Sequence, residues 1–373
     1  MRLGVNAVRL TLPFTGVGRY LDNLLREWSA MTLPFDDVVL YAPARLDPSR
    51  VTFPAARYRV EICGRPLPDP IWEWWSLGPR AREIDVLFSP SYTLPLGYRG
   101  KAVVSYFGPA TNDRGAYEWW RAAIYDRLHR ASARCAVRVL TGATVAKQRV
   151  VEVYGVPEAR VEVIPLAAAP QFVRVTDPTF LARARRDHLG DHAPYVLFVG
   201  KLSGRHHVPR LIEAFARARA AAALPHRLLL VGPNALGLDV PSLARAHGVS
   251  EAVVHVPRVP EPDMPALYSA AEVFVFPATE AEGFGFPIVE AMACGTPVLS
   301  TALGSVPEVA GDAALLVPSS TVEALAEGLL RLLRDSRLRD EMGRCGLERV
   351  RRLSWRTTAE KTMEALWQVR GLQ

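Results

Sequence analysis

The chain has 373 residues, 49% of them hydrophobic, and a formal net charge of +7. Its length is typical of about two domains, each with enough apolar material for its own core. No apolar run approaches the ~18 residues of a transmembrane helix and the start does not resemble a signal peptide, which favours a cytoplasmic protein, with peripheral contact at the inner face of a membrane left open.

The first half of the chain alternates short apolar runs with segments of helical periodicity. The runs that have the length and composition of strands lie at residues 3–8, 38–42, 58–62, 86–89, 102–106, 137–141 and 161–165. The pattern then breaks at residues 165–170, and a polar stretch follows up to Pro194. We interpret this stretch as the link between two domains, with one short helix in it.

A glycine-containing segment, TGVGRY at residues 15–20, joins the first strand to a helix predicted to begin near Tyr20. Gly16 and Gly18 would let the backbone approach a phosphate closely. A tight turn that needs two glycines explains the same residues equally well. The segment is therefore a weak candidate for donor binding.

Tryptophans gather in the first half of the chain, at Trp72, Trp74, Trp75, Trp119 and Trp120. Packing between helices in the core is the simplest interpretation. Exposed rings would instead stack on a sugar, line an apolar acceptor or touch a membrane interface. The sequence leaves these alternatives open.

The second half of the chain has a clearer alternating pattern. Its apolar runs lie at residues 195–199, 228–231, 253–256, 273–276, 297–300 and 314–317, and helical segments such as 209–222, 267–271 and 287–293 separate them. Strands that are apolar on both sides and alternate with helices predict a parallel sheet covered on both faces. We therefore expect an α/β protein of two facing Rossmann-like domains, at residues 1–170 and 171–354, with a ligand between them at the carboxyl ends of the strands.

Basic residues follow two of the predicted strands. Lys201 and Arg205 come after the strand that ends at Gly200, where they are candidates for contacts with a diphosphate. Arg258 follows the strand at 253–256 and is a further candidate for donor binding. Taken alone, Lys201 and Arg205 are explained equally well by a solvated loop. Together with the glutamates described next, they favour a nucleotide-binding cleft.

The most informative segment is EGFGFPIVE at residues 282–290. It places Glu282 on a glycine-broken loop and Glu290 in the opening turns of a helix. A helix start offers free N–H groups and a partial positive charge, which suit a phosphate or orient a carboxylate. Gly283 and Gly285 let the backbone approach a ligand. Two solvated glutamates on an ordinary crossover are the alternative for this segment alone.

The charge and the cysteines point to little further chemistry. Arginines such as those at 183–186 and 217–219 have helical spacing, which is more typical of solvated helix faces than of a nucleic-acid stripe. We therefore expect no nucleic-acid partner. The cysteines lie far apart without metal-ligand spacing, which predicts reduced, buried thiols and no metal site. They are Cys63, Cys135, Cys294 and Cys345.

Taken together, these residues resemble glycosyltransferase family 4, the retaining enzymes of GT-B architecture. The similarity runs nearly from end to end, through TGVGRY at 15–20, YGVPEARVEVIP at 154–165, YVLFVGKLSGR at 195–205, PALYSAAEVFVFP at 265–277, EGFGFPIVEAMACGTPVLS at 282–300 and GSVPEV at 304–309. The segment with the two glutamates is the most specific of these.

The resemblance implies roles for the donor-side residues. Glu282 would bind sugar hydroxyls, and Glu290 would accept from both ribose hydroxyls of the nucleotide. The backbone from Gly283 to Pro287, including Phe284, Gly285 and Phe286, would line the sugar and the phosphates. The last helix, at about 355–373, would cross back onto the N-terminal domain.

Several positions depart from the pattern that family 4 usually shows. In the N-terminal half, Phe107 and Gly108 stand where a His-Asp pair is usual, and with Trp119 they are acceptor-side candidates. Residues 142–144 stand in place of a Ser-Glu pair, and residues 167–169 are alanines where Gly-Val-Asp or Gly-Val-Asn is common. These changes suggest an altered acceptor side.

Two departures fall in the donor-binding half. Lys201 replaces a common arginine, which keeps the charge but loses the bidentate fork. His206 stands where a lysine is usual and is therefore a candidate for contact with the donor diphosphate when it is charged. Both glutamates are kept.

The resemblance implies a retaining, metal-independent glycosyltransferase of hexosyltransferase type that uses a UDP- or GDP-sugar as donor and needs no cofactor. Lys201 and Arg205 would hold the charge of the leaving diphosphate, and with Glu282 they are the catalytic candidates. The acceptor would be a small molecule, a glycan or a lipid-linked sugar. A non-catalytic relative that binds a nucleotide sugar or a partner enzyme is the alternative, and sugar-nucleotide epimerisation is a third.

Overall fold

The structure is a computed structural model that describes residues 1–12, 16–49, 51–108, 119–279 and 282–371, without the side chains of residues 119–121. It divides into two compact units, which are described one at a time. Unit 1 comprises Met1–Pro109, Ala123–Ala167 and Ser354–Gln373, and unit 2 comprises Ala110–Ala122 and Ala168–Leu353.

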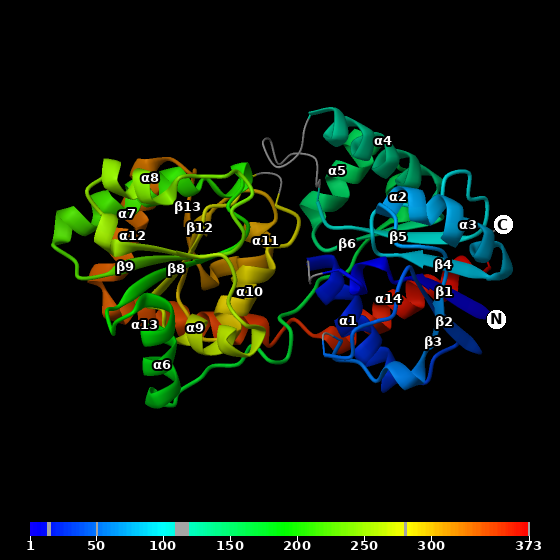
Figure 1. Ribbon diagram of the computed structural model, residues 1–373, viewed down its shortest axis with the longest axis horizontal. Helices are drawn as coiled ribbons and strands as arrows, with labels where there is room; N and C mark the ends of the chain where they lie inside the picture. Colours follow the sequence, from blue (N-terminus) through cyan, green and yellow to red (C-terminus); the bar gives the residue numbers. More distant parts are fainter. Residues whose placement is uncertain (13–15, 50, 109–118, 280–281, 372–373) are drawn as a thin grey trace. The chain divides into compact units, whose positions relative to one another are not determined.

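Unit 1 is built on a seven-stranded sheet in the order β3-β2-β1-β4-β5-β6-β7, and every pairing is parallel (Figure 1). The strands are β1 Arg2–Asn6, β2 Asp37–Ala42, β3 Arg59–Ile62, β4 Val86–Ser89, β5 Ala102–Tyr106, β6 Arg138–Thr141 and β7 Val161–Val163. Each lies within two residues of a run predicted from the sequence. Because β1, β4 and β5 are parallel neighbours, their carboxyl ends lie side by side at one edge of the sheet.

The helical segments of unit 1 are η1 Val8–Leu10, α1 Gly16–Ser29, η2 Ala55–Arg57, α2 Asp69–Trp72, η3 Glu73–Leu77, α3 Gly78–Arg80, η4 Ala81–Glu83, α4 Trp119–Cys135, α5 Thr144–Tyr154, η6 Glu158–Arg160 and α14 Trp355–Val369. The prediction that the first helix begins near Tyr20 was wrong, because α1 begins at Gly16. Two glycines weaken a helix start in isolation, but burial of its apolar face overrides that preference.

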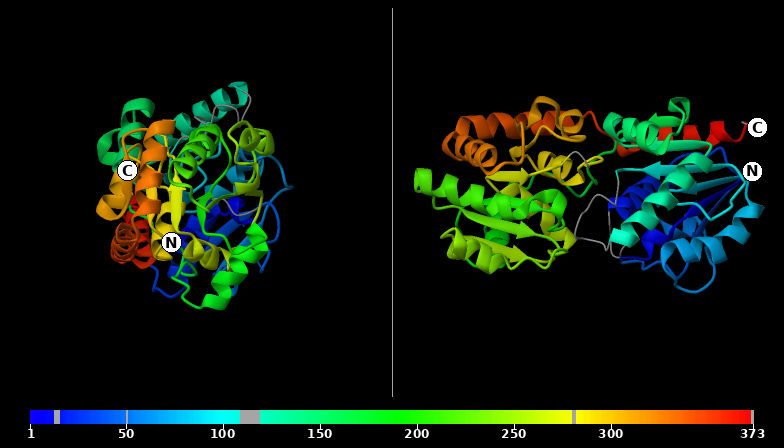
Figure 2. Two further views of the ribbon diagram at one scale, coloured as in Figure 1. Left: turned by 90° about the vertical axis from the view of Figure 1, so that its left-hand side faces the viewer. Right: turned by 90° about the horizontal axis from the view of Figure 1, so that it is seen from above.

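Helices cover both faces of the unit 1 sheet (Figures 1 and 2). On one face, Leu87, Val104 and Val139 of the strands pack in one buried cluster with Trp72 of α2 and Ala133 of α4. On the other, α1 packs against α14, and the indole Nε1 of Trp28 donates to the carbonyl of Ala359 over 3.0 Å. The predicted return of the last helix to the N-terminal domain is thereby confirmed.

Unit 2 has a six-stranded parallel sheet in the order β10-β9-β8-β11-β12-β13. Its strands are β8 Tyr195–Val199, β9 Arg227–Val231, β10 Val253–Val256, β11 Val273–Phe276, β12 Val298–Thr301 and β13 Leu315–Val317. Its helices are α6 Pro178–Leu189, η7 Gly204–His206, α7 Val208–Ala222, α8 Val240–Ala246, η8 Ser250–Ala252, η9 Glu261–Asp263, α9 Met264–Ala270, α10 Phe286–Ala293, α11 Val306–Ala310, η10 Gly311–Ala313, α12 Val322–Arg334 and α13 Ser336–Val350. The alternation of strands and helices predicted for this half is confirmed.

Among the residues that the structure describes, no helix is long and apolar enough to cross a membrane. The cysteines are free, and Cys63 and Cys294 are buried as expected. Cys135 is exposed at the end of α4, so the prediction of buried thiols was wrong for this residue.

Candidate functional site

The candidate site of unit 2 lies where β8 and β11 end. These strands are neighbours in the sheet, so the loop after β8 and the loop after β11 leave the same edge side by side. The first loop carries Lys201, Arg205 and His206, and the second carries Glu282. The topology therefore brings the predicted basic residues and the predicted carboxylate to one place.

His206 links the two loops. Its Nδ1 lies 2.6 Å from the carbonyl oxygen of Lys201, and because a carbonyl only accepts, Nδ1 carries the hydrogen. Its Nε2 lies 3.9 Å from Oε2 of Glu282. The ring packs at 5.0 Å from the ring of Phe276 and at 5.6 Å from that of Phe198. His206 is therefore a buried residue with fixed ring orientation, and not an exposed loop residue.

Backbone contacts hold Glu282 in place. Its N–H donates to the carbonyl of Thr279 over 3.0 Å, and its own carbonyl accepts from the N–H of Ser305 over 3.2 Å. Gly304 has φ +58°, and a Cβ there would lie 2.7 Å from the carbonyl oxygen of Thr279. Only glycine fits at that position, which lets the loop before α11 press against the loop of Glu282.

Gly285 turns the chain from this loop into α10. It has φ +80°, and its carbonyl accepts from the N–H of Ile288 over 2.9 Å. A side chain would be strained at this φ, so the glycine is needed for the turn itself. The rings of Phe284 and Phe286 lie 5.3 Å apart beside the turn. Gly283 is buried and Pro287 is half-buried next to them.

Glu290 is the fifth residue of α10, whose first residue is Phe286. Its side chain is 1% exposed, and its Oε2 accepts a hydrogen bond of 2.9 Å from the hydroxyl of Tyr268. Tyr268 comes from α9 and was not among the predicted residues. The sequence contains no signal for it, because the contact joins two helices that are separated by a strand and a loop.

The basic loop is fixed by the neighbouring strand end. Gly200 donates to the carbonyl of Val231 and Leu202 to that of Pro233, each over 2.9 Å. Lys201 is exposed between these anchors, and Arg205 is half-buried.

Arg258 is also at the carboxyl edge of the unit 2 sheet, but it follows β10, which is two strands away from β8. Its side chain is exposed. Of the basic candidates, it is the one that the topology places farthest from the loop of Glu282.

The remaining predicted residues belong to unit 1, apart from Trp119, which falls in the part of unit 2 at Ala110–Ala122. Gly16 and Gly18 lie in the first turn of α1 and not on a loop. Phe107 follows β5, with Gly108 next to it, and its ring lies 4.6 Å from the ring of Tyr20 in α1. The structure thus brings Phe107 to the start of α1. Trp119 opens α4, but its side chain is outside the described residues.

The tryptophan cluster divides into buried and exposed members. Trp72 is fully buried, and its Nε1 donates to the carbonyl of Cys63 over 2.7 Å, so it belongs to the core. Trp74 and Trp75 are exposed and lie outside the core. Core packing is therefore confirmed for Trp72, whereas the roles suggested for exposed rings stay predictions for Trp74 and Trp75.

Unit 1 also buries a carboxyl group that the sequence did not indicate. Glu73 is 1% exposed, and its Oε1 accepts from Nδ2 of Asn6 over 2.7 Å, at the end of β1. Burial raises its pKa to about 7, while hydrogen bonds from Thr93 and Asn6 oppose that shift.

Within the described ranges, no three His, Cys, Asp or Glu side chains gather closely enough to hold a metal ion. The charged groups around the ends of β8 and β11 include Lys201, Arg205 and the two glutamates. Such a set is suited to binding a phosphate ester and sugar hydroxyls.

Two family models match the chain in consecutive parts. The model for glycosyltransferase family 4 matches residues 14–171, and the model for group 1 glycosyl transferases matches residues 183–349. The chain belongs to glycosyltransferase family 4. The first match covers most of the unit 1 sheet, and the second covers the loop with Glu282 and the helix with Glu290.

Curated proteins of related sequence are glycosyltransferases. The O-antigen chain mannosyltransferase B of Escherichia coli is 28% identical over 228 residues, which are 61% of this chain and 59% of that protein. The D-inositol 3-phosphate glycosyltransferase of Kribbella flavida is 32% identical over 239 residues, or 61% of this chain and 55% of the relative. The chain thus matches less than two thirds of each of these proteins.

Solved structures agree over nearly the whole length. Anabaena Alr3699/HepE, in complex with UDP and glucose, superposes with a TM-score of 0.75 at 17% identity, covering 98% of this chain and 99% of that one. WaaG, a glycosyltransferase involved in lipopolysaccharide biosynthesis, gives a TM-score of 0.74 at 18% identity with the same coverage. These likenesses establish the GT-B fold of this family 4 member.

Proposed function

We propose that this family 4 protein transfers a sugar from a UDP- or GDP-sugar to an acceptor with retention of the anomeric configuration and without a metal ion. The observation that carries the proposal is the pairing of His206 with Glu282, with their Nε2 and Oε2 atoms 3.9 Å apart at the adjoining ends of β8 and β11. This arrangement fixes a carboxylate beside a basic loop. A nucleotide sugar needs both, one for its hydroxyls and one for its diphosphate.

In this proposal the donor lies across the loops of unit 2. Lys201 and Arg205 neutralise the charge that develops on the leaving diphosphate, in place of a cation. Glu282 binds hydroxyls of the donor sugar, and Glu290 binds the ribose. The acceptor hydroxyl attacks from the face that the diphosphate leaves, and a phosphate oxygen takes its proton.

Two features support a binding site of this kind. The backbone of Glu282 is held by a hydrogen bond to Thr279 in its own loop and by one from Ser305 in the loop before α11, which limits the positions of its carboxylate before a ligand arrives. Glu290 is buried with the hydroxyl of Tyr268 on one oxygen, which orients the carboxylate. Preorganised groups of this type contribute more to a transition state than mobile ones do.

The test is incubation with a panel of UDP- and GDP-sugars and detection of the released nucleoside diphosphate, with and without candidate acceptors. Turnover that persists in a chelator supports metal independence, and the anomeric signal of the product in proton NMR reports the stereochemistry. Binding of a nucleotide sugar without release would instead indicate a non-catalytic relative. An isomerised donor with its diphosphate intact would indicate an epimerase.

The acceptor is the least defined part of the proposal. The replacement of the usual His-Asp pair by Phe107 and Gly108 puts an aromatic ring where polar groups are common in the family. Phe107 is half-buried and packs against the buried ring of Tyr20, so that Phe107 is the aromatic side chain at the end of β5 that an acceptor could contact. We infer that the acceptor, whether a small molecule, a glycan or a lipid-linked sugar, has an apolar or ring face in contact with this region.

A further inference from the structure

Unit 1 has an unusually apolar stretch of exposed helix. Ile71, Trp74 and Trp75 are 45%, 50% and 68% exposed on the segment formed by α2 and η3. Their spacing of three and four residues places them on one side of the helical turn, whereas Trp72 and Leu77 of the same segment are buried in the core. The segment therefore has large apolar side chains on its solvent side as well.

Neighbouring loops extend this surface. Gly78, directly after η3, packs closely against Pro95, since a Cβ on Gly78 would lie only 3.2 Å from the Pro95 side chain. The exposed Leu96 follows Pro95 and therefore lies close to the end of η3. Gly64 likewise packs closely against the Ser76 side chain, which a Cβ on Gly64 would touch. The chain that leads from Gly64 to the exposed Leu67 therefore starts against the same helical segment. We call this surface the apolar face. Its members are Leu67, Ile71, Trp74, Trp75 and Leu96.

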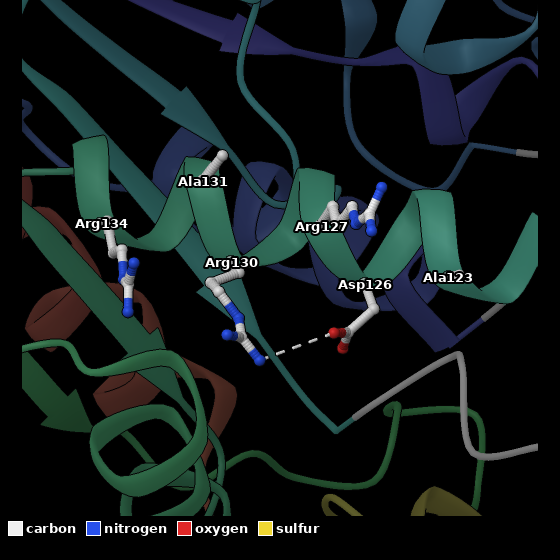
Figure 3. Close-up of a pocket in the computed structure, with 6 residues that line it drawn as sticks. All are labelled: Ala123, Asp126, Arg127, Arg130, Ala131 and Arg134. Atoms are coloured by element: carbon white, nitrogen blue, oxygen red, sulfur yellow. Dashed lines mark ion pairs between the residues drawn. The ribbon is translucent and has the colours of Figure 1, made fainter.

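Positive charge lies on the helix that shares this side of the sheet. An open hollow of about 350 Å³ runs along α4 and is lined by Ala123, Asp126, Arg127, Arg130, Ala131 and Arg134 (Figure 3). Asp126 lies 3.9 Å from Arg130, and the Arg134 Nε donates to the carbonyl of Tyr154. Since three arginines and one carboxylate line the hollow, it carries a net positive charge.

The apolar face and the hollow belong to one helical layer. Ser132 of α4 accepts a hydrogen bond of 2.9 Å from the N–H of Leu94, and the ring of His129 lies 5.4 Å from that of Tyr92. The segment from Tyr92 to Leu96 is thus held by α4 on one side and by η3 on the other. Trp72, Leu94 and Ala133 share one buried cluster beneath it.

We propose that this side of unit 1 docks on the surface of an anionic lipid bilayer, with Trp74 and Trp75 in the interface and the arginines of α4 against lipid phosphates. Tryptophan is enriched at the boundary between lipid headgroups and acyl chains, where one part of the ring is apolar and the other is wet. Each arginine near an anionic surface adds attraction. This docking goes beyond the glycosyl transfer proposed above and does not depend on it.

Charge favours a bilayer over a second copy of this chain. In a twofold dimer the same surface meets itself, so that the arginines of α4 would approach arginines of the other copy. Residues 65–99 of unit 1 also expose Arg65, Arg82 and Arg99 as well as Glu83 and Asp85, so the exposed charge there does not offset that of the α4 arginines. An anionic bilayer complements this charge.

The test is sedimentation of the full chain with vesicles of phosphatidylcholine alone and with vesicles that also contain phosphatidylglycerol. We expect binding to the anionic vesicles, together with a blue shift of tryptophan emission. Replacement of both tryptophans, Trp74→Ala with Trp75→Ala, should weaken binding at least about tenfold and remove most of the shift. Phe180→Ala is the matched control, because Phe180 is 56% exposed on unit 2, and it should bind as the wild type does.

A second pair of variants tests the charge. Arg127→Ser should weaken binding to the anionic vesicles about fivefold, whereas Arg331→Ser, at an exposed position of α12, should not. Thermal melting of each variant checks that it is folded. Equal binding of the wild type and the tryptophan double variant, or no binding to either vesicle at low salt, would overturn the proposal. Self-association that the double variant abolishes, without vesicle binding, would make the surface an interface between copies.

Discussion

The Nε2 atom of His206 lies 3.9 Å from Oε2 of Glu282, while Nδ1 of the same ring is held by the carbonyl of Lys201. One buried imidazole therefore connects the basic loop after β8 with the carboxylate loop after β11. The resemblance to family 4 would lead one to expect a lysine at this position. Here the ring faces a carboxylate and so is suited to positioning Glu282, besides any contact with the donor.

Two substitutions of His206 separate the contacts of its two nitrogens. His206→Asn keeps a donor near the position of Nδ1 but has nothing at Nε2, whereas His206→Gln has the reverse. If the contact with Glu282 matters for catalysis, His206→Asn should lower kcat about tenfold with little change in the affinity for nucleoside diphosphate. The measurement is steady-state release of nucleoside diphosphate, with thermal melting as the control for folding. Full activity of His206→Asn would show that Nε2 is not needed.

The contact with the ribose depends on Glu290. Glu290→Gln should weaken binding of the nucleoside diphosphate by about 1.5–3 kcal/mol, because a charged acceptor of two hydroxyls is lost while the shape is kept. Isothermal calorimetry measures this change. Tyr268→Phe is the companion variant, since it removes the hydroxyl that donates to Glu290. It should reduce stability more than affinity. Unchanged affinity in a well-folded Glu290→Gln variant would remove this residue from the site.

Neutralisation of the diphosphate is assigned to Lys201 and Arg205. Alanine at either position should reduce turnover on the order of a hundredfold, as is typical when a donor to the transition state is lost. Arg258→Ala should lose much less, since Arg258 follows a strand two places away from β8. The comparison is made at saturating donor. Should both loop variants keep full turnover, the start of α1 at Gly16 and Gly18 becomes the better candidate for the diphosphate.

The buried Glu73 predicts a pH dependence of stability. Its pKa is raised from 4.5 to about 7 in the folded protein, so the folded state holds a proton that the unfolded state releases between these values. The contribution of Glu73 to the free energy of unfolding is therefore fully present below about pH 4.5. It is lost as the pH rises through about 7, by up to about 3 kcal/mol in total.

Glu73→Gln should remove this decline, because an amide stays neutral at every pH. Urea unfolding at pH 5 and pH 8 measures the difference, and the variant should lose less stability between the two than the wild type does. Glu83→Gln, at an exposed position, is the control and should behave as the wild type. Parallel pH profiles for wild type and Glu73→Gln would mean that Glu73 is charged in the folded state at neutral pH.

The regular part of the fold could be predicted from sequence because local signals agree there. The strands at 195–199, 253–256 and 273–276 coincide with their apolar runs, since each run is followed directly by Gly or Pro. The helix α1 begins four residues before its predicted start, because two glycines have a weak helix preference and the packing that stabilises this turn has no local signal in the sequence.

Contacts between distant side chains could not be predicted in this way. The spacing of Glu282 and Glu290 indicated a site, but neither the buried ring of His206 nor the hydroxyl of Tyr268 has a local signature. The sequence likewise groups Trp72, Trp74 and Trp75 in one short segment without showing which of them faces the core. Burial of Glu73 beside Asn6 was missed for the same reason, because its partner is 67 residues away in the chain.

The central claim is that the loops after β8 and β11 form a catalytic site for a nucleotide sugar. The most direct test is the release of nucleoside diphosphate by wild type and by Glu282→Gln, each with the UDP- or GDP-sugar that binds best in calorimetry. We predict acceptor-dependent release by the wild type and a loss of at least about a hundredfold in the variant, with binding of the nucleoside diphosphate kept. Equal release by the two proteins would contradict the account, as would tight donor binding by the wild type without release for any acceptor.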